Sequence, residues 1–202
     1  IAVGRDGRLS GPELLEALTR GLLSTGIDVI DLGMVATPMV YFAANQTING
    51  QNPKSGIMIT GSHNPPNYNG FKMVLGGAAI YGEKIQGLYQ QIQNKSFKQG
   101  QGQRSQFDIF PMYLQRIVSD VHLARPMKIT IDCGNGVGGA FATQLFRTLG
   151  CEVEELFCEV DGNFPNHHPD PAHLENLQDL IQNLTQTTSE LGLAFDGDAD
   201  RL

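Results

Sequence analysis

Short apolar runs alternate along the chain with longer stretches whose apolar residues recur every three or four positions. The runs predict buried strands at residues 1–4, 27–32, 56–60, 70–75, 128–133, 152–157 and 191–195. The longer stretches predict amphipathic helices at residues 11–26, 37–48, 82–93, 109–122, 138–149 and 174–185. Strands that alternate with helices in this way are typical of an α/β fold with a mostly parallel sheet.

The first predicted helix carries signals at both of its ends. Ser10 and Glu13 have the spacing of a capping box, in which each side chain bonds the backbone N–H of the other residue. Pro12 falls in the first turn, where its missing N–H costs least, and Gly26 suits the end of the helix. We therefore expect the Ser10 hydroxyl to cap this helix.

A polar stretch interrupts the pattern near the middle of the chain. Residues 94–106 are rich in Gln, Gly, Ser and Lys, and Phe97 is their one aromatic residue. This composition is typical of a linker, so we predict one domain over residues 1–108 and a second over residues 109–202. A surface excursion within a single domain is the alternative. The chain opens inside an apparent strand and stops directly after a motif, so we expect both domains to continue beyond the given residues.

Composition narrows the class of protein. The 202 residues suffice for one large or two modest hydrophobic cores, and no apolar run is long enough to span a bilayer. A formal net charge of -7 argues against a nucleic-acid partner, which requires a basic face. Cys133, Cys151 and Cys158 show no CxxC spacing and predict free thiols in a reducing cytoplasm.

A hydroxyl stands directly after the third predicted strand, in the segment TGSHNPP that starts at Thr60. Ligands of α/β proteins bind at the carboxyl ends of strands, where we expect Ser62 to lie. Gly61 permits a close backbone approach, and N–H groups in such a turn can cradle a phosphate. His63 and Lys72 are near enough in sequence to join this site. The alternative is a tight turn, and no acid partner supports a hydrolase triad.

Three carboxylates alternate in the segment DGDADR near the end of the chain. Asp196, Asp198 and Asp200 can face one side of an extended loop and converge on a cation, and their hard oxygens favour Mg²⁺ or Ca²⁺ over zinc. An EF-hand requires glycine directly after the third acidic position, where this chain has Arg201. That arginine is suited to bind two phosphate oxygens at once. A solvated acidic turn is the alternative.

A glycine run supports a rival class of protein. Residues Gly134–Gly139 follow a predicted strand, open a helix and fit the dinucleotide fingerprint GxGxxG, with Glu154 and Glu155 about twenty residues further on. The interpretation we favour is a tight strand-to-helix turn in which glycine permits close packing.

Two further groups of residues give weaker signals. On paper, a zinc site could be assembled from Cys158, His167, His168, Asp170 and His173. Their spacing matches no standard ligand pattern, and the neighbouring prolines indicate a rigid loop instead. Arg5 and Arg8 follow the first predicted strand, where phosphate contact and simple solvation are equal alternatives.

Five segments of the chain resemble the α-D-phosphohexomutase family, most closely its bacterial phosphomannomutase/phosphoglucomutase branch. They are VGRDGRLSG from Val3, TGSHNPPNYNGFK from Thr60, DCGNGVGG from Asp132, DGNFPNHHPDP from Asp161 and DGDADR from Asp196. The serine and aspartate segments are specific as a pair, whereas the glycine run is not. The resemblance implies an α/β fold of two tandem three-layer α/β/α domains with mixed, mostly parallel sheets, as the first two of four domains.

The resemblance also implies roles for individual residues. The implied ligands of one Mg²⁺ are Ser62, Asp196, Asp198 and Asp200. Ser62 carries a phosphate in the resting enzyme, and Lys72 is a proposed general acid/base. His63 belongs to the active-site loop, Arg201 lies beside the phosphoserine, and Arg5 is expected to contact phosphate.

The implied reaction is the reversible transfer of phosphate between the 1- and 6-positions of a hexose phosphate, mannose or glucose or both. It proceeds through the phosphoserine and a bisphosphorylated sugar, with glucose 1,6-bisphosphate as activator. We expect a cytoplasmic monomer without nucleic-acid or membrane partners. The third and fourth domains would read the sugar and its phosphate, so residues 1–202 alone are expected to be inactive. The alternatives are a dinucleotide-binding domain and a non-catalytic module that binds a metal or a phospho-ligand.

Overall fold

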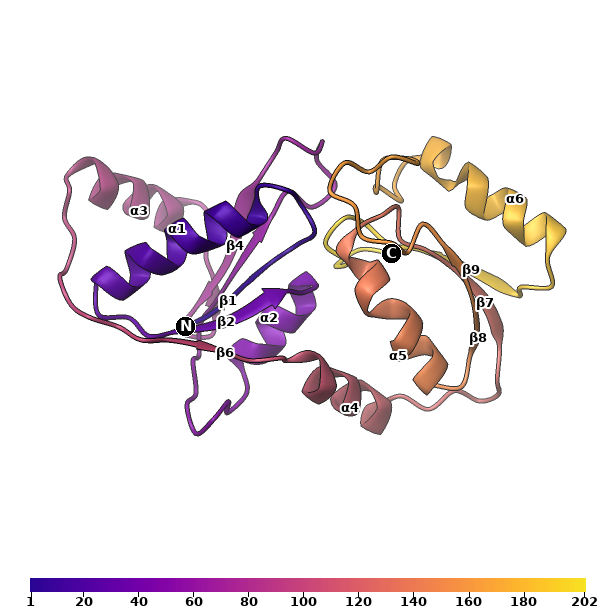
Figure 1. Ribbon diagram of the computed structural model, residues 1–202, viewed down its shortest axis with the longest axis horizontal. Helices are drawn as coiled ribbons and strands as arrows, with labels where there is room; N and C mark the ends of the chain where they lie inside the picture. Colours follow the sequence, from indigo (N-terminus) through magenta and orange to yellow (C-terminus); the bar gives the residue numbers. More distant parts are fainter.

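The computed structural model describes residues 1–202, which form two β-sheets with helices packed on both (Figure 1). The first sheet has the strand order β5-β4-β3-β1-β2-β6, and the second has the order β8-β7-β9. The strands are β1 Ala2–Arg5, β2 Val29–Met34, β3 Gly56–Thr60, β4 Gly70–Leu75, β5 Ala78–Ala79, β6 Arg104–Gln106, β7 Lys128–Asp132, β8 Glu152–Leu156 and β9 Leu191–Ala194. The helices are α1 Gly11–Ser24, α2 Thr37–Ala44, α3 Glu83–Gln93, α4 Phe110–Asp120, α5 Ala142–Thr148 and α6 Gln178–Gln186. The pairs β3–β4 and β4–β5 are antiparallel and the others parallel, which confirms the predicted mixed, mostly parallel α/β fold.

Successive residues along the strands of the first sheet point to opposite faces, which explains why helices cover both faces. Ala2 and Met58 point to one face and join the core beneath α2. Their neighbours Val3 and Ile59 point to the opposite face, beneath α1. Because successive strand residues face opposite sides, a strand that is apolar throughout must be covered on both faces. The three-layer arrangement of this half follows from that requirement.

The second sheet is covered in the same way. Ile129 and Ile131 pack into the core beneath α5, whereas the hydroxyl of Thr130, between them, donates to Asn183 Oδ1 of α6 at 2.8 Å. Helices α5 and α6 therefore cover opposite faces. Ile109, directly before α4, is fully buried in the core of the first sheet, and α4 contacts both α2 and α5. This helix joins the two halves.

The start of α1 and the region of β6 differ from the prediction. The Ser10 hydroxyl does not cap α1. The Ser10 backbone is helical, with φ -79° and ψ -11°, instead of extended as in a capping residue, and its hydroxyl accepts a hydrogen bond from the Asn69 amide at 2.5 Å. Strand β6 lies within the predicted linker and pairs in parallel with β2. All of its side chains are exposed, so no apolar run marked it in the sequence.

Three predicted helices are shorter or less regular than expected. Helix α2 ends at Ala44, although Ile48 beyond it is still buried, in a bridge with Gln51. The helices predicted at 138–149 and 174–185 begin as 3₁₀ turns, η1 Val137–Ala140 and η2 Leu174–Leu177. In the first of these turns, paired glycines have low helix propensity, and Gly139 packs against the backbone of Cys158.

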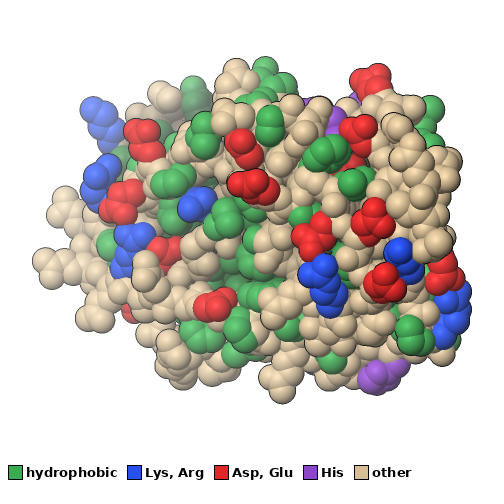
Figure 2. All heavy atoms as spheres, turned by 45° about the vertical axis from the view of Figure 1, so that its right-hand side comes forward, with side chains coloured by type: hydrophobic (Ala, Val, Ile, Leu, Met, Phe, Trp, Pro, Cys, Tyr) green, Lys and Arg blue, Asp and Glu red, His purple; other side chains and the backbone are tan.

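The surface carries mixed charge. Figure 2 shows acidic and basic side chains interspersed over one face of the molecule, so the net charge of -7 does not gather in a single patch there. None of the helices combines the length and the apolar character needed to cross a membrane.

An ion pair ties the loop of residues 163–171 to the second sheet. His167 Nε2 lies 3.0 Å from Asp132 Oδ2, and the Asp132 side chain at the end of β7 is 0% exposed. The His167 ring packs edge-on against Phe157, with 5.3 Å between ring centroids. The hydrogen bond with Asp132 raises the pKa of His167 above its ordinary value, although burial acts in the opposite direction.

This pair predicts a stability that depends on pH. Because the folded pKa of His167 lies above its unfolded value of about 6.5, the stabilisation from its charge is complete below about pH 6.5. It is lost as the pH rises through the folded pKa. His167→Gln keeps a hydrogen-bond donor but carries no charge. We therefore expect wild type to exceed this variant in free energy of unfolding by more at about pH 5.5 than at about pH 9.

Urea denaturation at the two pH values measures the difference, and Asp132→Asn supplies the control. In the Asp132→Asn background, His167→Gln should change the free energy of unfolding by the same amount at both pH values. A gap between wild type and His167→Gln that is equal at both pH values would contradict the prediction.

Candidate functional site

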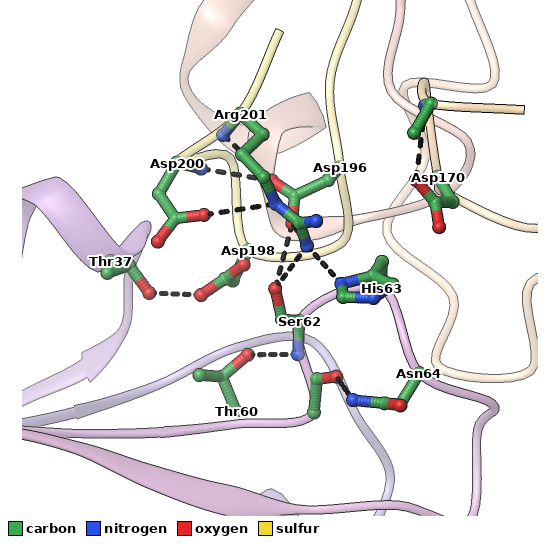
Figure 3. A network of polar contacts seen from close by, with 12 residues as sticks. Thr37, Thr60, Ser62, His63, Asn64, Asp170, Asp196, Asp198, Asp200 and Arg201 are labelled. Atoms are coloured by element: carbon green, nitrogen blue, oxygen red, sulfur yellow. Dashed lines mark hydrogen bonds and ion pairs between the residues drawn. The ribbon is translucent and has the colours of Figure 1, made fainter. Parts of the chain in front are cut away.

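The predicted serine and aspartate loops meet between the two sheets. Strand β3 ends at Thr60, two residues before Ser62, and β9 ends at Ala194, two residues before Asp196. In Figure 3 the loop that carries Asp196 lies over Ser62, which projects from the other half of the chain. Both segments follow the carboxyl ends of strands with parallel neighbours, the edge at which α/β proteins bind ligands. Each sheet therefore contributes half of one site.

The backbone of Ser62 is held in an unusual conformation. Its φ is 51°, in the left-handed region, and its N–H donates to Thr60 Oγ1 at 2.7 Å. The Thr60 hydroxyl donates in turn to Asp6 Oδ2 at 2.8 Å. Burial raises the pKa of the Asp6 carboxyl, although hydrogen bonds from Arg8 and Thr60 oppose the shift. This chain of bonds fixes the direction of Ser62 and leaves its Oγ free for other contacts.

Arg8 is the buried residue that organises the serine loop. Its guanidinium donates to the carbonyl oxygens of four loop residues, namely Ser62 at 2.9 Å, Asn64 at 2.6 Å, Tyr68 at 3.0 Å and Pro65. Its Nε donates to Asp6 Oδ2 at 3.2 Å, and the Phe164 ring lies over the guanidinium at 5.3 Å. The Arg8 side chain is 0% exposed, so it is neither solvated nor available to a phosphate.

The three alternating aspartates converge as their spacing predicts. One oxygen from each of Asp196, Asp198 and Asp200 lies within 4.8 Å of the others. Asp196 and Asp198 are buried, whereas Asp200 reaches the surface. The Ser62 hydroxyl donates to Asp196 Oδ2 at 2.9 Å and so lies at the edge of this carboxylate cluster.

The carboxylate cluster has the chemistry of a site for a hard cation. Lys72 pairs Asp198 at Oδ2, but Oδ1 is buried without a hydrogen-bond partner, and leaving a buried polar atom unpaired is costly. Carboxylate and hydroxyl oxygens are the ligands that Mg²⁺ prefers. The residues present therefore fit the implied ion, which Ser62, Asp196, Asp198 and Asp200 would hold.

Lys72 and Thr37, from the first half of the chain, also contact the carboxylate cluster. Lys72 Nζ lies 2.7 Å from Asp198 Oδ2 and 2.5 Å from Asp200 Oδ2. Burial lowers the pKa of Lys72, but the hydrogen bonds and charges of these two carboxylates outweigh it and raise the pKa. The Thr37 hydroxyl donates to Asp198 Oδ2, and the Thr37 N–H donates to the Asp198 carbonyl at 3.0 Å. Lys72 therefore lies against the carboxylate cluster, and its role as a general acid/base stays a prediction.

Asp196 and Asp198 lie in different electrostatic surroundings. Burial and the charge of Asp198 raise the pKa of Asp196. Burial also acts to raise the pKa of Asp198, but hydrogen bonds from Lys72 and Thr37 lower it below its ordinary value. Asp198 is the more firmly ionised of the two.

Arg201 closes the cluster from the solvent side. Its Nη2 donates to Ser62 Oγ at 2.7 Å and to Asp196 Oδ2 at 2.7 Å, and it contacts His63 Nδ1 (Figure 3). The structure thus brings together the predicted Ser62, His63 and Arg201.

Arg5 is a predicted site residue that lies outside the cluster. Its Nη1 donates to the Asp6 carbonyl at 2.9 Å, and it makes no hydrogen bond to Ser62 or the aspartates. It ends strand β1 on the same edge of the sheet as the site. Phosphate contact by Arg5 stays a prediction.

Glycine permits the close contact between the two loops. A β-carbon on Gly197 would lie 2.2 Å from the Ser62 carbonyl oxygen, and one on Gly136 would lie 3.0 Å from Gly197 Cα. The Val137 N–H donates to the Gly197 carbonyl at 3.1 Å. The glycine run therefore supports the aspartate loop from behind, which agrees with the packing interpretation.

The loop of residues 163–171, which we call the histidine-rich loop, and Gly162 directly before it contact the first half of the chain. His168 Nε2 contacts the carbonyl oxygen of His63, and a β-carbon on Gly162 would lie 2.8 Å from the Gly7 carbonyl oxygen. His167, in contrast, bonds to Asp132. His173 Nε2 lies 3.7 Å from Asp170 Oδ2, but the five residues from which a zinc site could be assembled on paper do not gather into one group.

Sequence reasoning missed Asp6, Thr37 and Thr60 as parts of the site. Thr60 and Asp6 lie at the carboxyl ends of β3 and β1, and Thr37 opens α2. These positions, at strand ends and at the start of a helix, could have identified them as candidate site residues. Asp6 and Thr60 also lie within two of the segments that carry the family resemblance, but their bonds, like those of Thr37, depend on the tertiary fold.

Similarity to known proteins agrees with this geometry. Two domain profiles match, "Phosphoglucomutase/phosphomannomutase, alpha/beta/alpha domain I" over residues 1–99 and "domain II" over residues 111–202. The phosphoglucomutase of Neisseria gonorrhoeae is 60% identical over 100% of this chain and 44% of its own length. The phosphomannomutase/phosphoglucomutase of Pseudomonas aeruginosa is 54% identical over 100% of this chain and 43% of its own length. The crystal structure of a phosphoglucomutase/phosphomannomutase family protein from Burkholderia thailandensis matches with a TM-score of 0.96 and 58% identity, over 98% of this chain and 44% of that chain.

The chain thus spans less than half the length of these relatives. Both of its halves match domains of one family, and the serine and aspartate loops meet as that family's motifs imply. The chain belongs to the phosphoglucomutase/phosphomannomutase family.

Proposed function

We propose that this chain supplies the phosphoserine loop and the metal loop of an enzyme that moves phosphate reversibly between the 1- and 6-positions of a hexose phosphate. The Ser62 hydroxyl carries this proposal, because it lies 2.9 Å from Asp196 Oδ2 and 2.7 Å from Arg201 Nη2. A hydroxyl between a guanidinium and a carboxylate cluster suited to a cation is placed to hold a phosphoryl group. The names of the relatives include both glucose and mannose mutases, so the proposal includes both sugars.

The proposed reaction begins with phosphate on Ser62. A sugar hydroxyl attacks the phosphorus, the bond to Ser62 Oγ breaks, and the proton of the sugar hydroxyl is passed on to the serine oxygen. The resulting sugar bisphosphate turns over in the site. Ser62 Oγ then attacks its other phosphate and regains a phosphoryl group. Glucose 1,6-bisphosphate would activate enzyme that has lost its phosphate by the same transfer.

Phosphoryl transfer has a loose transition state, so catalysis rests mainly on positioning and on neutralising oxygen charge. Arg201 can bind two phosphoryl oxygens with its planar fork, and His63 contacts that fork. Lys72 presents an ammonium beside the cluster, where it can stabilise the transferring group and exchange a proton with the sugar hydroxyl. When bound, Mg²⁺ supplies Lewis-acid chemistry at the phosphoserine oxygens.

In this proposal, residues 1–108 and 109–202 act as two domains of a cytoplasmic, monomeric enzyme. Because relatives are more than twice as long, we propose that residues 1–202 do not complete the turnover alone. A dinucleotide-binding role is not favoured, since the glycines of its fingerprint pack against the protein's own backbone.

Ser62→Ala should abolish phosphorylation and leave the fold intact, because the bonds that hold the loop use the Ser62 backbone. Incubation with glucose 1,6-bisphosphate and Mg²⁺, followed by intact mass and peptide mapping, should find one phosphoryl group at Ser62 in wild type and none in the variant. In the full-length protein, mutase activity should fall by roughly 10³-fold or more. Ser24→Ala, at the exposed end of α1, is the matched control.

A full-length wild type that stays unphosphorylated would favour the non-catalytic module. Full activity in the Ser62→Ala variant would remove the phosphoserine mechanism altogether.

Asp198→Asn should weaken Mg²⁺ binding by roughly 10- to 100-fold, because it removes the charge of a carboxylate that hydrogen bonds from Lys72 and Thr37 keep more firmly ionised than Asp196. Isothermal titration calorimetry measures the affinity. Asp179→Asn, an exposed change in α6, controls for the loss of one negative charge. Equal Mg²⁺ affinity in wild type and Asp198→Asn would exclude the aspartate loop as the metal site.

Arg8→Met should lower the free energy of unfolding by about 3–5 kcal/mol, because it leaves Asp6 buried without its ion partner and removes the donor to four carbonyls. Urea denaturation measures the loss, and Arg20→Met on the exposed face of α1 is the control. Adding Asp6→Asn to Arg8→Met should cost less than the two single losses together. A loss below about 1 kcal/mol in Arg8→Met would contradict its role.

A further inference from the structure

Two of the three cysteines lie in contact at the carboxyl edge of the second sheet. Cys133 directly follows β7, Cys158 lies two residues beyond β8, and their Sγ atoms are 3.5 Å apart. Neither thiol has a part in the proposed transfer of phosphate. Cys151 is also a free thiol, but it stands at the start of β8, near the opposite edge of the sheet.

The two sulfurs differ in a way that suits stepwise oxidation. Cys133 is fully buried, whereas Cys158 is partly exposed. The contact between the two thiols lowers the pKa of Cys158 and raises that of Cys133, while burial acts against ionisation of both. Cys158, the more exposed of the two, is therefore the thiol that an oxidant meets first, and Cys133 is the contacting partner that can resolve it.

The pair lies directly behind the aspartate loop. The Cys133 carbonyl accepts a hydrogen bond from the Gly136 N–H at 2.7 Å, and a β-carbon on Gly139 would lie 1.9 Å from the Cys158 carbonyl oxygen. From the same turn, the Val137 N–H bonds the Gly197 carbonyl at 3.1 Å. The turn of residues 134–139 is thus packed between the cysteines and the aspartate loop.

We propose that Cys133 and Cys158 are a redox modification site, at which a hydroperoxide converts the two thiols to a disulfide and thereby displaces the turn that supports the aspartate loop. The Cys158 thiolate attacks the O–O bond of hydrogen peroxide and becomes a sulfenic acid, and the leaving hydroxide takes up a proton as water. The Cys133 sulfur then attacks the Cys158 sulfur, the S–O bond breaks, and a second water leaves. Both sulfurs are oxidised, and one peroxide is reduced to two waters.

The bond requires the two sulfurs to move. A disulfide has its sulfurs about 2.05 Å apart, so the pair must close by roughly 1.5 Å from its present separation. Both cysteines contact the turn through their backbones, so the part of this closure that the backbones take up shifts the turn with them. The consequence for the metal rests on the proposed function, whereas the formation of the disulfide does not.

Peptide mapping after oxidation tests the bond itself. Reduced protein is treated with hydrogen peroxide, free thiols are blocked with N-ethylmaleimide, and the protein is digested with trypsin and a glutamyl endopeptidase, which separates Cys151 from Cys158 at Glu152. We expect a linked Cys133–Cys158 peptide, a mass roughly 2 Da lower before blocking, and a blocked Cys151. Dithiothreitol should reverse the change, and Cys151→Ala should behave as wild type.

Other products of the mapping would overturn the proposal. They are a Cys158 oxidised to the sulfinic acid without a link to Cys133, a link that includes Cys151, or three thiols that remain free at peroxide concentrations that oxidise an unstructured cysteine peptide. Cys158→Ala should form no disulfide. Because the main result is read on wild type, poor folding of that variant leaves the test intact.

Hydrogen exchange and calorimetry test the coupling to the aspartate loop. In oxidised protein the Val137 amide should exchange faster, and Mg²⁺ should bind roughly tenfold or more weakly, with no change in peroxide-treated Cys158→Ala. A disulfide with unaltered exchange at Val137 would overturn the coupling. Absence of Mg²⁺ binding even in reduced protein would instead reject the proposed metal site, and the exchange measurement would still decide the coupling.

Discussion

The buried guanidinium of Arg8 is the contact on which the rest of the site depends. It follows the central strand β1, yet it bonds the backbone of the neighbouring serine loop at four carbonyls, so the position of Ser62 is tied to the middle of the sheet. Hydrogen bonds to a charged donor strengthen when water is excluded. Phe164, from the second half of the chain, covers the guanidinium and contributes to that exclusion. Docking of the histidine-rich loop and order in the serine loop therefore depend on one another.

Electrostatic interactions also make the two halves of the chain depend on one another. The carboxylates of the three aspartates lie within 4.8 Å of one another and repel. From the second half of the chain, the cationic side chain that contacts them is Arg201, at the solvent side. Lys72 and the hydroxyl of Thr37 come from the first half and engage the buried Asp198. Lys72 is itself partly buried and needs those carboxylates as partners. Neither half is electrostatically complete alone, so the site forms as the halves dock.

The parts of this structure that sequence could predict are those encoded by adjacent residues. Ser62 and the aspartates follow strands marked by apolar runs, and their convergence follows from the rule that ligands bind at the carboxyl ends of strands. Strand β6 carries no such run, because its side chains face solvent and only its backbone pairs. Arg8 looked like any arginine in a turn, and its burial is decided by residues 54 to 60 positions away. The predicted Ser10 cap is absent, since its backbone is helical and its hydroxyl contacts a distant amide, Asn69. Competition between local and distant partners is not visible in a local pattern.

The left-handed backbone of Ser62 links these contacts to the chemistry. This conformation costs an L-residue roughly 1–2 kcal/mol, and the residue makes no side-chain bond to its own loop that would offset it. The offset comes instead from the N–H bond to Thr60 and the carbonyl bond from Arg8, which both use only the Ser62 backbone. Both bonds leave Oγ unused, so it is directed at Asp196 and Arg201. In the proposed reaction, the strain is therefore held by backbone atoms that take no part in the transfer of the phosphoryl group.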